Sequence, residues 1–202
     1  LYFDFSGYSD MALGIGRMFG LFLPANFYSP YKSRSIAEFW RRWHMSLSFF
    51  VRDYVYIPLG GSRKSLGRTA ANLILAFTLI GIWHGAGFTF VLWGLYHGAL
   101  VTLSHMARAY LWFSKMPAAA KTGITFLLVH FGWVMFRAPS VEAAFKLYQD
   151  MIIPRLNYGG TVYHVYAEFS FGCVFVGLAA LLAFFGPNAL ELLGSPSHNR
   201  FL

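Results

Sequence analysis

The chain has 202 residues, of which 57% are hydrophobic, 20% are aromatic and only 12% are charged. Soluble globular domains carry about a quarter charged residues, so the composition excludes an ordinary soluble domain and indicates a polytopic membrane protein. The formal net charge of +8 would also suit nucleic-acid binding, but in so apolar a chain we expect the basic residues to face a membrane surface, with no nucleic-acid partner.

We therefore predict an all-α fold, a polytopic bundle of membrane helices that forms a single membrane domain over residues 1–202. At about 20 residues for each crossing, the apolar segments allow roughly four to six spans. The sequence opens without Met and without a signal-peptide pattern. We expect it to be a fragment of a longer chain with further helices at its ends.

The first predicted helix covers residues 9–23 and ends at a proline. A basic segment follows over residues 30–68, with eight Lys and Arg residues against two acidic residues. Such an excess of positive charge in a connecting segment is typical of the cytoplasmic side of a membrane protein. We predict that residues 30–68 form a cytoplasmic basic segment at the membrane interface.

Within this segment, residues 35–51 are predicted to form one amphipathic helix. Ser35 and Glu38 have the spacing of a capping box. At about 100° per residue, the arginines fall opposite an apolar stripe and His44 lies at the border. The stripe consists of Ile36, Phe39, Trp40, Trp43, Leu47 and Phe50. This pattern predicts a helix that lies along the membrane interface.

The longest charge-free stretch, residues 69–107, contains His84 in the sequence GIWHGAG. We predict two apolar helices, residues 69–83 and 88–110, that hinge at these glycines. An ionisable side chain at membrane depth usually faces the protein interior or a wet cavity. Broken backbone is tolerated in a membrane only where protein buries it or where it lines a cavity. His84 is therefore the leading candidate for a reaction site.

Three further helices are predicted after this stretch. Residues 122–136 are bracketed by Lys121 and Arg137 and predict a short or tilted crossing. A short interfacial helix is predicted to start at Ser140, followed by a loop over residues 154–161. Residues 169–190 carry no charge and are long enough to span. They include Cys173, the one cysteine, which we predict to be a small buried hydrophobic residue.

Several kinds of catalytic site are excluded by spacing. No two histidines lie three or four residues apart, so we expect no metal site. The nucleophile elbow of serine hydrolases and the common phosphate-binding loops are also missing. A neutral imidazole can still take the proton of a hydroxyl that attacks a thioester. On the residues alone, His84 is equally a catalytic base or a hydrogen-bonded core histidine, and His44 is an ordinary interfacial histidine or a second catalytic group.

Five motifs, in this order and spacing, resemble the membrane-bound O-acyltransferase (MBOAT) family. They are most similar to its alginate O-acetylation branch, with the D-alanyl-lipoteichoic-acid transfer proteins as close relatives. The similarity extends from the first residue to about residue 138. It is carried by residues 3–12 (FDFSGYSDMA), 39–48 (FWRRWHMSLS), 52–61 (RDYVYIPLGG), 83–98 (WHGAGFTFVLWGLYHG) and 132–138 (GWVMFRA).

The resemblance implies a helical funnel with the family's essential histidine at His84 and its second histidine at His44. The other histidines are expected to have structural roles: His97, His105, His130, His164 and His198. The family transfers an acyl group from a cytoplasmic thioester to a hydroxyl that is reached from the opposite side. The resemblance thus implies a multi-pass O-acyltransferase of the bacterial inner membrane, most similar to O-acetyltransferases.

The donor is expected to be acetyl-coenzyme A or an acyl carrier thioester, used as a substrate, with no bound cofactor. Arginine forks suit the phosphates of such a carrier, although the same residues would also bind anionic lipid headgroups. Arg52 has a third possible role, as the partner of Asp53. The predicted substrate-binding residues are Arg41, Arg42, Trp43, Arg52 and Trp83.

The acceptor is expected to be an exported polysaccharide or a partner protein, such as a periplasmic acetyltransferase. An alternative function has no chemistry of its own. In that case the chain belongs to an acyl-group translocator or channel subunit that feeds a separate periplasmic transferase. Activity of the purified protein alone toward a thioester donor distinguishes the two.

Overall fold

The computed structural model describes residues 1–107, 115–152 and 162–192, and every regular element in these ranges is a helix, as predicted. The elements are α1 (Tyr2–Met18), η1 (Pro30–Lys32), α2 (Ile36–Arg42), α3 (Met45–Val51), the π-helical turn η2 (Arg52–Tyr56), α4 (Leu66–His84), α5 (Phe88–Ala107), α7 (Ala118–Arg137), α8 (Val141–Ile152), α9 (Val162–Phe185) and α10 (Ala189–Leu192).

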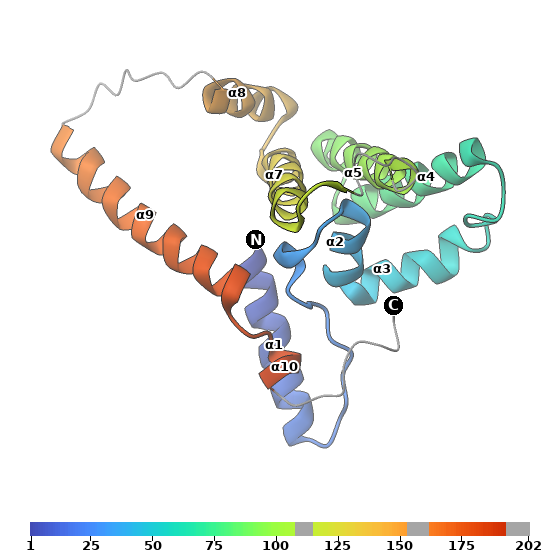
Figure 1. The fold of residues 1–202 in the computed structure, drawn as a ribbon, viewed down its shortest axis with the longest axis horizontal. Helices are drawn as coiled ribbons and strands as arrows, with labels where there is room; N and C mark the ends of the chain where they lie inside the picture. The colour runs from blue at the N-terminus through green and yellow to red at the C-terminus, as the bar shows by residue number, and fades with distance from the viewer. Residues whose placement is uncertain (108–114, 153–161, 193–202) are drawn as a thin grey trace.

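The helices α4 and α5 form an antiparallel hairpin that is the centre of the fold (Figure 1). The short helix α2 and the longer helix α7 both pack against α5, and they also contact each other. Only the C-terminal end of the straight helix α9 approaches this centre, where it contacts η1 (Figure 1). The N-terminal segment, α2 and the α4–α5 hairpin therefore place the candidate site.

Glycines let the backbones of α4 and α5 approach each other closely. A methyl group added at Gly94 would lie 2.5 Å from the carbonyl oxygen of Phe77, and one added at Gly98 would lie 2.8 Å from the Cα of Ile74. Gly81, on α4, is equally close to the backbone of Phe90. Small residues at helix contacts are the usual means of close packing in membranes.

A cluster of aromatic side chains fills the space between α2, α5 and α7. Phe39 and Trp43 stack at 5.5 Å between ring centroids, and Trp93 and Trp133 stack at 6.1 Å. Trp40 joins the two pairs, with its ring 5.7 Å from Trp93 and 5.7 Å from Phe39. All five side chains are buried. The apolar stripe of the basic segment therefore packs mainly against the protein, and only its predicted member Phe50 is exposed.

Two of the described helices, α4 and α7, are long and apolar enough to cross a membrane. Only about a third of each apolar stretch is buried inside the protein, 33% in α4 and 28% in α7. The length predicted for the helix at residues 122–136 was wrong. In the structure this helix, α7, has 20 residues rather than 15, because it begins at Ala118 and includes Lys121.

Two other predicted helices have different ends in the structure. The first helix covers Tyr2–Met18 instead of residues 9–23. It stops early because Gly20 takes a left-handed backbone with φ +73°, a conformation that glycine adopts readily. The single helix predicted over residues 35–51 is also wrong, since α2 ends at Arg42 and α3 begins at Met45.

The prediction for Cys173 was wrong as well. The side chain is exposed, as are most side chains of α9 over residues 172–185. Apolar surroundings in the sequence indicate a membrane helix, but they do not tell a protein-facing side from an outward-facing one.

Candidate active site

His84 is the last residue of α4, which ends because the backbone of Gly85 is extended. The imidazole is half-buried and lies against aromatic rings from two other helices. The ring of Trp93, on α5, is 5.4 Å away, and that of Phe136, on α7, is 5.0 Å away, both edge-on. The side chain therefore faces the protein at the end of the α4–α5 hairpin where residues 85–87 connect the two helices.

His44 lies at the break between α2 and α3 and takes a left-handed backbone, with φ 45° and ψ 53°. Its ring packs edge-on against Phe5 of α1 at 4.8 Å and lies 6.3 Å from the ring of Trp83. Burial lowers the pKa of His44 from 6.5 to about 4, and the nearby His84 adds a smaller lowering. The imidazole of His44 is therefore neutral at physiological pH.

The structure thus brings the two predicted catalytic histidines to the same place from two separate helix breaks. Trp83 is close to both, with its ring centroid 4.9 Å from that of His84 and 6.3 Å from that of His44. Trp83 is 64% exposed, so the ring is open to a ligand on one side. Trp43, the other predicted substrate-binding tryptophan, is buried in the aromatic cluster.

A buried hydrogen bond connects α2 to α5 behind the two histidines. Trp40 Nε1 donates to Nδ1 of His97 over 3.3 Å, which places the ring proton of a neutral His97 on Nε2. His97 is fully buried, and a methyl group added at Gly132 of α7 would lie 2.6 Å from its Nε2. His97 thus packs between helices, in keeping with the structural role expected for it.

Sequence reasoning missed two aromatic residues that form the wall behind His84. Trp93 touches both His84 and His97, at ring distances of 5.4 Å and 5.0 Å. Phe136 packs on His84 from α7. Trp93 and His97 lie four residues apart on one helix and so share a face, a signal that would have found Trp93. The position of Phe136 depends on how α7 packs and has no local signal.

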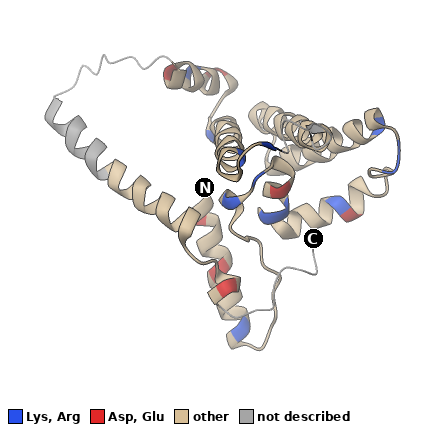
Figure 2. Ribbon diagram, in the orientation of Figure 1, with Lys and Arg blue, Asp and Glu red and all other residues tan. Residues whose placement is uncertain are grey.

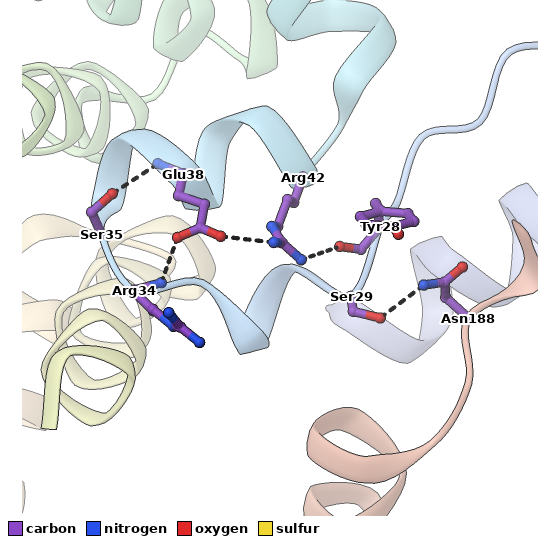
Figure 3. Close-up of polar contacts among 7 residues, drawn as sticks. All are labelled: Tyr28, Ser29, Arg34, Ser35, Glu38, Arg42 and Asn188. Carbon is purple, nitrogen blue, oxygen red and sulfur yellow. Dashed lines mark hydrogen bonds and ion pairs between the residues drawn. The ribbon is translucent and has the colours of Figure 1, made fainter. Parts of the chain in front are cut away.

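Among the predicted substrate-binding arginines, Arg42 is engaged within the basic segment. It forms an ion pair with Glu38 at 2.7 Å, and its Nη1 donates to the carbonyl oxygen of Tyr28 over 3.4 Å (Figure 3). Glu38 also accepts from the backbone N–H of Arg34 at 2.9 Å, while its own N–H donates to Ser35 Oγ over 3.1 Å. The Ser35 cap is confirmed, and Glu38 binds Arg34 and Arg42.

Arg52 pairs with its neighbour Asp53 through two hydrogen bonds, of 2.7 Å and 3.1 Å. This pairing raises the pKa of Arg52 and lowers the pKa of Asp53. Arg63 and Lys64 are exposed in the turn before α4. The Lys and Arg residues named here lie in α2, in η2 and in this turn (Figure 2).

A cavity of about 280 Å³ lies between α2, α3, η2 and α4. Its walls are mostly apolar and follow α4 as far as Ile80, one turn before His84. Arg41 and Arg52 line it as well, so the cavity joins basic side chains to an apolar interior. Its other walls include Trp40, Tyr56, Phe77 and Val101.

The remaining histidines lie away from this place. His105 is exposed, and Nδ1 of His130 lies 2.9 Å from the carbonyl oxygen of Phe126 in the same helix. The side chain of His164 and all of His198 lie outside the described residues. Across the described chain, no three His, Cys, Asp or Glu residues are grouped as a metal site would require.

An all-helical chain with apolar helices long enough to span, and with two histidines meeting at helix breaks, defines a membrane protein with a polar site among its helices. The family model of the membrane-bound O-acyltransferases matches residues 1–142, and the chain belongs to this family. The resemblance stated from the motifs is confirmed.

Relatives with known names are similar over most of the chain. A peptidoglycan O-acetyltransferase of Helicobacter pylori is 49% identical over 156 residues, and the probable alginate O-acetylase AlgI of Pseudomonas aeruginosa is 50% identical over 151 residues. Each match covers 75% of this chain but only 29% of the relative. A teichoic acid D-alanyltransferase of Bacillus subtilis is 36% identical over 67% of this chain and 38% of its own. The chain therefore spans about three tenths of the length of the first two relatives.

Proposed function

We propose that this chain carries the reaction site of a membrane O-acyltransferase, one that moves an acetyl group from a cytoplasmic thioester to a hydroxyl. The acceptor is an exported polysaccharide or a partner protein that passes the group on. The observation that carries the proposal is that His84 and His44, from two separate helix breaks, both lie close to the exposed Trp83. The names of the relatives, two of them O-acetylating proteins, agree with it.

In the proposed reaction, His84 is the general base. Its neutral imidazole takes the proton of the acceptor hydroxyl while the oxygen attacks the carbonyl carbon of the thioester. A C–O bond forms, the C–S bond breaks, and the thiolate leaves and regains the proton from the imidazolium. His44, neutral at physiological pH, contributes a hydrogen bond that positions the donor or the acceptor.

The cavity beside α4 suits the donor. Its mostly apolar walls suit the extended chain that links the thioester to its carrier. The cavity extends along α4 to Ile80, one turn before His84. Arg41 and Arg52 line it and would bind carrier phosphates. Arg42 is bound to Glu38 and Tyr28, so its contribution is to hold α2 in place. Trp83 would pack against the acyl group or the acceptor.

The proposed location is the bacterial inner membrane, with several crossings. The basic residues of segment 30–68 would face the cytoplasm, where a positive excess is usual. This orientation puts the arginine-lined cavity on the side of the thioester donor. The acceptor would then reach His84 from the opposite side, through a funnel formed with helices of the longer protein.

The experiment uses the full-length protein in lipid nanodiscs, acetyl-coenzyme A with a labelled acetyl group, and a soluble oligosaccharide acceptor. His84→Ala is expected to lower ester formation by about 10²- to 10⁴-fold, the usual contribution of a general base. His105→Ala, an exposed histidine on α5, is the control and should keep wild-type activity. Equal activity in wild type and His84→Ala would refute the proposal. Passage of acetyl groups across vesicles without ester formation would favour the translocator.

A further inference from the structure

The backbone of His44 is held in a conformation that its residue type disfavours. Ser29 and His44 are the non-glycine residues with positive φ in the described chain. A left-handed backbone is unfavourable for a residue with a Cβ, and such residues persist only where the surrounding structure holds them. Something outside the two short helices must therefore hold His44.

The extended segment 26–28 provides these contacts, on both sides of His44. On the N-terminal side, the N–H of Tyr28 donates to the carbonyl oxygen of Arg42 over 3.0 Å. On the C-terminal side, the N–H of Met45 donates to the carbonyl oxygen of Asn26 over 3.0 Å. One short piece of chain thus fixes the residues before and after the break.

The side chain of Asn26 adds two further bonds at the start of α3. Its Oδ1 accepts from the hydroxyl of Ser46 at 2.6 Å and from the backbone N–H of Ser46 at 3.3 Å. The Ser46 N–H belongs to the first turn of α3, where no preceding carbonyl is in reach. Asn26 therefore replaces the cap that His44, the residue at the N-cap position, does not supply.

The position of the His44 imidazole depends on this arrangement. A helical backbone through residues 43–45 would turn the side chain to another face of the segment, since successive helical residues lie about 100° apart. With the observed backbone, the imidazole lies between Phe5 and Trp83, beside His84. The contacts of Asn26 decide whether His44 reaches the site.

We propose that Asn26 is a positioning residue of this enzyme, which acts by holding the left-handed backbone that places His44 beside Trp83. The inference rests on the proposed function, in which His44 takes part in acyl transfer. Asn26 itself does not touch the reacting atoms. Its effect on catalysis passes through His44 alone.

The experiment measures acyl transfer by the full-length protein in nanodiscs for Asn26→Ala, His44→Ala and the double variant. Asn26→Ala is expected to lower kcat by about 10- to 100-fold, the range of a misplaced catalytic group, with KM for the thioester nearly unchanged. The double variant should be no slower than His44→Ala, because residues that act as a unit are not additive. Asn26→Asp keeps the side-chain acceptor oxygen at Oδ1 and should restore most of the activity.

Asn72→Ala is the matched control. Asn72 is a buried asparagine of α4 that, like Asn26, bonds to backbone, donating to the carbonyl oxygens of Leu59 and Gly61 over 3.1 Å and 3.4 Å in the turn before α4. Its loss should slow transfer by the same factor in wild type and in His44→Ala. If Asn26→Ala behaved in the same additive way, or left kcat unchanged, the positioning role would be overturned.

Failure of the proposed function is distinguished from failure of this inference by the histidine variants. In that case His84→Ala and His44→Ala would both form ester as fast as the wild type. A folding defect is recognised with His44→Gly, in which the left-handed backbone is no longer strained. In that background Asn26→Ala should lower the unfolding temperature less than it does in wild type. An equal loss in both backgrounds would show that Asn26 does not hold this conformation.

Discussion

The break after α4 and the break between α2 and α3 each carry a histidine, but different interactions hold them. At the first, Gly85 ends α4, and the flanking helices α4 and α5 approach so closely that glycines are needed at their contact. At the second, no glycine is present, and hydrogen bonds from Asn26 and Tyr28 fix His44 in a left-handed backbone.

One site can therefore contain two side chains whose positions are fixed by different kinds of interaction. The position of His84 follows from helix packing, which is distributed over many atoms. The position of His44 follows from a few directed polar contacts made by a distant piece of chain. We therefore expect packing changes to disturb the first histidine and single polar changes to disturb the second.

The largest expected effect is on the packed hairpin. Gly94→Val puts a branched side chain where even a methyl group would lie 2.5 Å from the carbonyl oxygen of Phe77. Overpacking of this kind costs about 3 kcal/mol, so membrane abundance and unfolding temperature in detergent should both fall. Gly123→Ala, where a methyl group meets nothing within 4 Å, is the control and should be harmless. Wild-type stability of Gly94→Val would contradict the close approach of α4 and α5.

The next effect concerns the buried hydrogen bond that holds α2 on the hairpin. Trp40→Phe keeps an aromatic ring but leaves Nδ1 of His97 without its donor, in a site closed to solvent. An unpaired buried acceptor costs about 1–3 kcal/mol. Chemical unfolding in detergent should show this loss. The control Trp83→Phe removes an exposed indole and should change stability by no more than about 0.5 kcal/mol.

The break at the glycines beside His84 could be predicted from the sequence, and the break at His44 could not. The glycines beside His84 are local signals that interrupt an apolar run. Trp43 and His44, in contrast, are not helix breakers, and the apolar stripe continues through them. The contacts that part α2 from α3 come from residues 26–28, which lie in a different segment. A pattern within residues 35–51 contains no trace of them.

The arginines show the same limit in another form. Glu38 and Arg42 are four residues apart on a helix, the spacing of a stabilising pair, and the structure forms that pair at 2.7 Å. The helical periodicity placed Arg42 on the cationic face and predicted substrate binding, without the ion pair to Glu38. Asp53 was recognised beside Arg52, and that pairing is present. Local charge partners can be predicted, whereas the cavity that Arg41 and Arg52 line depends on tertiary packing.

A smaller effect compares the caps of the two helices next to the histidines. Ser35→Ala removes the acceptor for the N–H of Glu38 at the start of α2, a bond of 3.1 Å, and should cost about 1 kcal/mol. Ser65→Ala removes the corresponding bond at the start of α4, which is longer, at 3.4 Å, and exposed. The loss should therefore be smaller for Ser65→Ala when both are measured by thermal unfolding. The reverse order would mean that α2 does not depend on its cap.

An effect of a different kind is a pH dependence at the break that carries His44. The pKa of His44 is lowered from 6.5 to about 4 in the folded protein, chiefly by burial. Between these two values the unfolded chain binds more protons at this position, so stability falls as the pH is lowered through this window. His44→Asn removes the titrating group, and asparagine accepts a left-handed backbone better than most residues.

The difference in unfolding temperature between wild type and His44→Asn should therefore stay constant between pH 7.5 and pH 6.5. From pH 6.5 toward pH 4, the unfolding temperature of the wild type should fall relative to that of the variant. Parallel profiles for wild type and His44→Asn would mean that the imidazole is protonated as easily in the folded chain as in water. In that case His44 would not be buried beside Phe5 and Trp83, and the hydrogen bonds at the second break would not hold it in the site.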